Sequence, residues 1–76
     1  MNKENRKDLE KAVSLIEQAR EIVEAIKDGE QEKFDSLTEG LQQSERGQKF
    51  EQDASDLDDI FNQLDEAIGN INNITE

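Results

Sequence analysis

Cysteine, histidine, proline, tryptophan and tyrosine are absent from this 76-residue chain, and its only aromatic residues are three phenylalanines. Without Cys or His there is no thiolate or imidazole for nucleophilic catalysis, for a zinc site or for a disulfide. No apolar run is longer than two adjacent residues, so the sequence contains neither a membrane span nor the core of a signal peptide. These absences predict a cytoplasmic protein with no enzymatic function, no metal, no cofactor and no membrane partner.

Basic residues are few, since 9 Lys and Arg stand against 20 Asp and Glu, and the formal net charge is −11. Nucleic acids and anionic membranes attract basic patches, so direct binding to nucleic acid is not expected. Charged residues make up 38% of the chain and hydrophobic residues 32%. A chain this short and polar folds only if its apolar residues share one face.

Apolar residues in the first third recur at steps of three and four, which is the period of an amphipathic helix. Leu15, Ile22 and Val13 widen this stripe. Its seam consists of Leu9, Ala12, Ile16, Ala19, Val23 and Ile26. The pattern predicts a helix over 3–27 that ends at Asp28-Gly29, because Gly closes a helix C-terminus at little steric cost.

A longer and more regular seam fills the last third and predicts a helix over 45–74. Ser44 is the expected N-cap, with Glu45 in the first turn. Ile60, Ala67 and Ile74 flank the stripe. The seam itself consists of Phe50, Ala54, Leu57, Phe61, Leu64, Ile68, Ile71 and Thr75.

Between these helices, Phe34, Leu37 and Leu41 follow steps of three and four and permit a short helix over 30–37 that pauses around Thr38. An alternative is that this helix runs on into Gly40. The sequence thus predicts an all-α fold, a helical hairpin with a short connecting helix.

Two amphipathic helices with wide stripes cannot bury both stripes in a lone hairpin. We therefore expect a homodimer that completes a four-helix bundle, with a monomeric three-helix mini-bundle as the alternative. The expected dimer and core seam consists of Leu9, Ile16, Val23, Ile26, Phe50, Leu57, Phe61, Leu64, Ile68 and Ile71.

The acidic excess is unevenly placed along the chain. Residues 1–27 are neutral, residues 28–47 carry −4, and residues 48–76 carry −7. Arg20 and Lys27 are the cations best placed to neutralise the last helix in an antiparallel hairpin. The expected acidic face for partner binding consists of Asp53, Asp56, Asp59, Asp65 and Glu66. Such a face either keeps the protein soluble or, as a row of fixed carboxylates, imitates a nucleic-acid backbone.

Two further segments admit a functional interpretation. The tract Asp53–Asp59 superficially resembles a calcium loop, but it lacks the central Gly and the final Glu, and it lies within the heptad pattern, so no metal site is expected. The segment from Glu39 to Gly47 is either a plain connector or a recognition loop, in which Gln43, Glu45 and Arg46 would contact a partner.

A resemblance to a known family extends over nearly the whole chain. It rests on the opening Met1-Asn2-Lys3 with Arg6-Lys7, the central Phe34-Asp35-Ser36-Leu37, the segment 40–47 and the acidic heptads. The chain resembles a family of short acidic proteins, mostly uncharacterised, that phages and prophages of Gram-positive bacteria encode. Many members have Pro at the position of Thr38, which implies a helix break there.

The resemblance implies a phage or prophage accessory protein in the cytoplasm of a bacterial host. Together with the acidic face, it suggests binding to a basic surface of a host or defence protein, as an inhibitor that imitates nucleic acid. The alternative is a structural, self-assembling coiled-coil module whose acidity serves solubility only.

Overall fold

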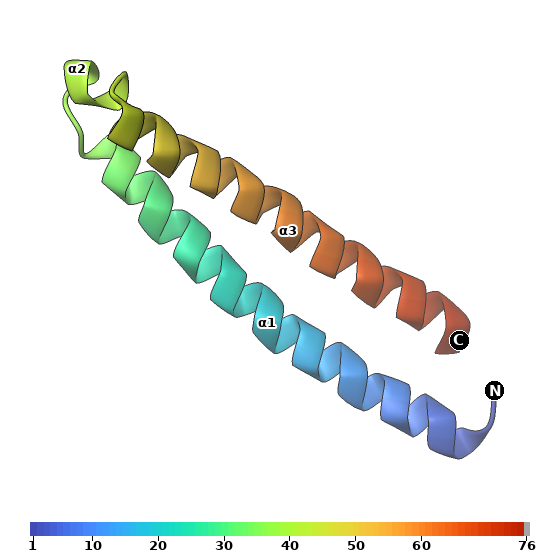
Figure 1. Cartoon of the computed structure of the whole chain (residues 1–76). Coiled ribbons are helices and arrows are strands. Elements are labelled where there is room, and N and C mark those ends of the chain that lie inside the picture. Colours follow the sequence, from blue (N-terminus) through green and yellow to red (C-terminus); the bar gives the residue numbers. More distant parts are fainter. Residues whose placement is uncertain (76) are drawn as a thin grey trace.

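The computed structural model describes residues 1–75, which form a hairpin of two long antiparallel helices (Figure 1). The elements in chain order are α1 (Lys3–Asp35), α2 (Glu39–Gln42) and α3 (Glu45–Thr75). The single turn of α2 sits at one end of the hairpin, and the two chain ends meet at the other (Figure 1). The predicted all-α fold with a short connecting helix is confirmed.

The first helix is longer than predicted, and the expected end at Asp28-Gly29 is wrong. Gly29 lies within α1, so the segment predicted as a separate helix over 30–37 is the last part of α1. No residue in 1–75 has a positive φ, so Gly29 does not form a helix-ending turn. A Gly costs a helix about 1 kcal/mol relative to Ala. Phe34 is half-buried and lines a hollow with Gln48, Glu51 and Gln52 of α3, and the burial of its ring favours continuation of the helix.

The break that reverses the chain lies at Ser36–Thr38, and the alternative of a continuous helix into Gly40 is also wrong. Ser36 is the C-cap of α1, and its hydroxyl donates to the carbonyl of Glu32 at 2.8 Å. Thr38 is extended, with φ −65° and ψ 159°, and begins α2. The side chain of Gln42 donates to the carbonyl of Phe34 at 3.2 Å, so α2 adds a second hydrogen bond to a carbonyl that already accepts from the backbone N–H of Leu37 at 3.1 Å.

The last helix begins at Glu45, as the sequence predicts. The Ser44 hydroxyl accepts from the backbone N–H of Gly47 at 3.2 Å, which is the geometry of an N-cap. The predicted seam of α3 faces α1: Ala54 and Ile68 are buried, and the other seam positions are half-buried.

The seam of α1 differs from the prediction at one residue. Ile26 is 50% exposed, while its neighbour Lys27 is half-buried. A helix of 3.6 residues per turn drifts by about 20° per heptad against a strict seven-residue repeat. Over the length of α1 this drift moves the inward position from Ile26 to Lys27, and then to Phe34. The remaining α1 seam residues in the predicted core, Leu9, Ile16 and Val23, are half-buried as expected.

The hairpin is long and thin. Its extents are 58 × 15 × 14 Å and its radius of gyration is 17.2 Å, whereas a compact chain of this length has about 11 Å. Among the described residues only Gly47, Ala54 and Ile68 are buried. Neither long helix has a stretch apolar enough to cross a membrane within residues 1–75.

Candidate functional site

Two ion pairs join the helices along one side of the hairpin. Arg20 of α1 bonds to Asp65 of α3, and Lys27 lies 3.4 Å from Asp58. Both cations also lie over the ring of Phe61, at 5.9 Å and 5.5 Å from its centroid. The prediction that Arg20 and Lys27 partly neutralise the acidic helix is confirmed.

Around these pairs the side is strongly acidic. A shallow hollow of about 410 Å³ lies there, and Asp28, Gln31, Glu51 and Asp58 are among the residues that line it. Residues seven apart share one side of a helix, so Glu24 and Glu17 lie on the side of Gln31, and Asp65 on that of Asp58. We call this surface the acidic side and define it by Glu17, Glu24, Asp28, Glu51, Asp58 and Asp65. Arg20 and Lys27 pair with two of these six carboxylates, so the eight residues together carry an excess of four negative charges.

The opposite side of the hairpin is different in character. At its end towards the loop, a hollow of about 250 Å³ brings Ile26 and Leu57 together with three carboxylates, those of Glu30, Asp53 and Asp56. Heptad spacing places Ile60 and Ile74 on the side of Asp53. Leu15 and Ile22 share their position with Gly29, which lines the neighbouring hollow at the loop end. We call this surface the uncharged face. Its large exposed residues are Leu15, Ile22 and Ile26 of α1 with Ile60 and Ile74 of α3.

The uncharged face carries no ionisable side chain over its central stretch. Between Ala12 and Gly29, the residues of α1 on this side belong to five uncharged types, namely Ala, Leu, Gln, Ile and Gly. Between Leu57 and Ile74, those of α3 are Leu, Ile, Gln, Ala and Asn. All charged residues of these two stretches lie on other sides of the helices, so the described hairpin separates its charge from its exposed apolar surface.

The five residues predicted as an acidic face do not form one patch. Asp53 and Asp56 line the hollow beside Ile26, whereas Asp65 lies on the other side and binds Arg20. Asp59 and Glu66 are exposed and lie two helical turns apart on the outer surface of α3. Half of the acidic side comes instead from α1, which sequence reasoning missed by dividing the charge by segment. The seven-residue spacing of Glu17, Glu24 and Gln31 is the signal that would have shown it.

Lys49 neutralises one of the predicted acidic residues. Its ammonium donates to the carboxylate of Asp53 at 2.7 Å. This hydrogen bond, with the negative charge of the carboxylate, raises the pKa of Lys49 above its usual value. A raised pKa means that the Lys49 ammonium stabilises the folded chain while it is charged, and that this contribution is lost as strongly alkaline pH deprotonates it.

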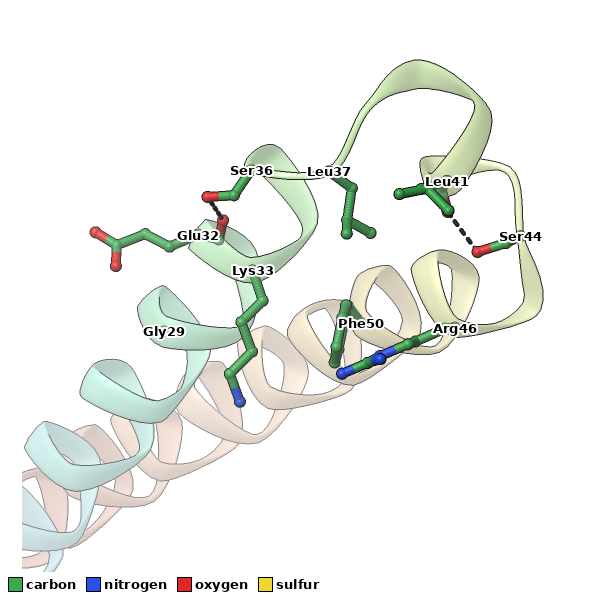
Figure 2. A pocket seen from close by; sticks show the side chains of 9 residues that line it. All are labelled: Gly29, Glu32, Lys33, Ser36, Leu37, Leu41, Ser44, Arg46 and Phe50. Atoms are coloured by element: carbon green, nitrogen blue, oxygen red, sulfur yellow. Dashed lines mark hydrogen bonds between the residues drawn. The ribbon is translucent and has the colours of Figure 1, made fainter.

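A larger hollow, of about 840 Å³, opens at the loop end beside the uncharged face. Figure 2 shows Leu37 and Leu41 above the ring of Phe50, with Lys33 and Arg46 flanking that ring. The two cations lie 5.8 Å and 5.6 Å from the ring centroid. The hollow therefore combines an apolar floor with two of the few cations of the chain.

The residues predicted as a recognition loop do not lie on one loop. Gln43 caps the C-terminus of α2, and its carbonyl accepts from the side chain of Gln48 at 3.2 Å. Glu45 and Arg46 lie in the first turn of α3, and Arg46 lines the loop-end hollow. Each of the three is exposed.

The tract Asp53–Asp59 is helical throughout, and no three acidic side chains in residues 1–75 converge as metal ligands would. Comparisons with protein-family models, with curated proteins and with solved structures find no match to this chain. The resemblance to short acidic phage proteins therefore stays a prediction, and the two sides of the hairpin are the features that can bind a partner. One can bind by charge, and the other by apolar contact.

Proposed function

We propose that this chain is a non-enzymatic binding protein whose acidic side binds a basic surface of another protein. The observation that carries the proposal is the gathering of six carboxylates from two helices on one side, against two cations. Both cations are engaged with carboxylates of α3, so Glu17, Glu24 and Glu51 have no ion pair within residues 1–75. A basic partner gains more from such fixed and unneutralised charges than from scattered ones.

The kind of partner follows from the charge and the shape. The net charge of −11 over a 58 Å rod amounts to about one negative charge per 5 Å, compared with about one per 1.7 Å for duplex DNA. The hairpin is thus a weaker linear polyanion than DNA, with a comparable rod-like form. We propose that it occupies the nucleic-acid groove of a host or defence protein in the bacterial cytoplasm, and that it acts there as a homodimer.

The experiment is capture of the partner from host lysate by the intact chain, followed by binding measurements on the purified partner. The double variant Glu24→Lys and Glu51→Lys cancels the excess negative charge of the acidic side and should weaken binding at least about ten-fold. The control is Asp59→Lys with Glu66→Lys on the outer surface of α3, which makes the same change in net charge away from both the acidic side and the uncharged face and should weaken binding much less. Duplex DNA should compete with the wild-type chain for the partner.

The competing function is a structural, self-assembling module whose acidity serves solubility only, and the exposed apolar residues of the uncharged face favour it. The two functions differ in one measurement. Equal binding by the acidic-side variant and its control, or binding unaffected by salt, would reject the acidic side as the binding surface.

A further inference from the structure

The uncharged face is the largest unexplained feature of the hairpin. Leu15 is 60% exposed, Ile22 62% and Ile26 50%. Ile60 and Ile74 of α3 are 41% and 59% exposed on the same side. We propose that a second copy of this chain covers this face, with the two hairpins antiparallel and α1 packed on the α1 of the partner. This proposal deepens the homodimer of the proposed function and is tested separately from what the acidic side binds.

The exposed area matches what a dimer would bury. The chain exposes 5722 Å², whereas a compact monomer of this mass exposes about 4,700 Å². The excess of about 1,000 Å² per chain is close to the roughly 800 Å² that each partner buries in an interface of standard size. Within the described residues only Ala54 and Ile68 are buried hydrophobic side chains, so a lone hairpin has almost no core. A second copy supplies the missing layer.

The charge distribution favours a second copy over a charged partner. Two chains of −11 repel each other wherever their acidic surfaces meet. The central stretch of the uncharged face comes from one side of α1 over 12–29 and one side of α3 over 57–74. These two parts lie side by side, because the helices are antiparallel and Arg20 and Lys27 pair with Asp65 and Asp58. Contact over the central stretch of this face therefore brings no carboxylates of the two copies together within the described residues.

The charges at the two ends of the uncharged stretch set the orientation. Its midpoint on α1 falls between Arg20 and Glu21, so in an antiparallel pair Asp8 of one copy faces Lys33 of the other, equally far from the midpoint. Lys11 faces Glu30 in the same way. Each pair joins opposite charges. With the loop ends together, α1 would instead pack on α3, and these four charges would lose their complementary partners.

The first test is the mass of the intact chain in solution, measured by analytical ultracentrifugation. The mass should rise from that of the 8.7 kDa chain towards twice that value over about 1 µM to 1 mM. Ile22→Gln should raise the dissociation constant at least about ten-fold. Circular dichroism should show its helix content intact, because Ile22 is 62% exposed in the hairpin. Asn62→Gln changes no charge and lies seven residues from Ser55 of the acidic-side hollow, so it is the control and should leave association unchanged.

The second test is disulfide cross-linking, which the absence of native Cys makes simple. In the antiparallel pair the two copies of residue 22 lie close to the symmetry axis, within reach of a disulfide, whereas the two copies of residue 8 lie about 37 Å apart along the helices. Ile22→Cys should therefore form a covalent dimer under mild oxidation, and Asp8→Cys should not. A mass that stays at 8.7 kDa at every concentration would overturn the proposal that a second copy covers the uncharged face. Equal cross-linking of the two variants overturns the antiparallel arrangement.

Discussion

Gly29 and Gly47 show how differently one residue type serves two helices. A Cβ built on Gly29 meets nothing within 4 Å. A Cβ on Gly47 would lie 2.4 Å from the carbonyl oxygen of Leu41 and 2.6 Å from that of Gln42. The first glycine only weakens α1, whereas the second lets the start of α3 approach the backbone of α2.

We predict opposite effects of alanine at these two positions. Gly29→Ala should raise the free energy of unfolding by about 0.5–1 kcal/mol, because Ala costs less entropy in a helix and meets no neighbour. Gly47→Ala should lower it by about 1–3 kcal/mol, because backbone carbonyls must move away from the new methyl group. Urea unfolding followed by circular dichroism measures both at one fixed protein concentration.

Gly69→Ala is the matched control for this pair. Gly69 is exposed in α3 and its Cβ would meet nothing within 4 Å, so the substitution should stabilise the chain as Gly29→Ala does. A neutral Gly47→Ala would mean that α2 does not lie against α3 as described.

At the scale of helices, the sequence correctly predicted those features that depend on the spacing of apolar residues. The seam of α3 and the cap at Ser44 needed only the spacing of apolar residues and one hydroxyl. The break at Gly29 was predicted from local propensity, which favours a stop there, but the helix continues to Asp35 and so half-buries Phe34 on the side of α3. Tertiary contacts of this kind are not visible in a local pattern.

The acidic side illustrates the same limit for function. Arg20 and Lys27 could be predicted as partners of the acidic helix because they share a heptad position. The contribution of Glu17, Glu24 and Asp28 could not be read from segment charges, because it depends on which sides of α1 and α3 adjoin. The displacement of Ile26 by Lys27 likewise arises from helix drift accumulated over several turns.

We predict that the cross-helix ion pairs differ in strength. A double-mutant cycle on Arg20→Ala and Asp65→Ala should give a coupling free energy of about 0.5–1 kcal/mol, since both side chains are partly exposed. The Lys27–Asp58 cycle should give a smaller coupling free energy, because the two charged atoms lie 3.4 Å apart. In addition, the ammonium of Lys lacks the planar fork of donors with which Arg binds a carboxylate. Chemical unfolding of the four chains in each cycle measures these values, and a larger coupling at Lys27 would contradict the observed geometry.

The whole molecule is organised by separation of charge from exposed apolar surface. A chain of −11 with evenly distributed carboxylates would repel a second copy in every orientation. Here the carboxylates leave one long side free, while the opposite side gathers an excess of negative charge. A dimer formed through the uncharged face would expose both acidic sides outward, so self-association and partner binding would use different surfaces of the same rod.

This separation predicts opposite effects of salt on the two proposed interactions. Raising the salt concentration from 0.1 M to 1 M shortens the Debye length from about 10 Å to about 3 Å and so strengthens the screening of charges. Self-association should strengthen by about 2- to 10-fold over this range, because repulsion between two chains of −11 is screened. Binding of a basic partner to the acidic side should weaken steeply over the same range. Ultracentrifugation and a binding assay in one salt series measure both trends. If salt weakened both interactions together, self-association would depend on the charged surfaces rather than on the uncharged face.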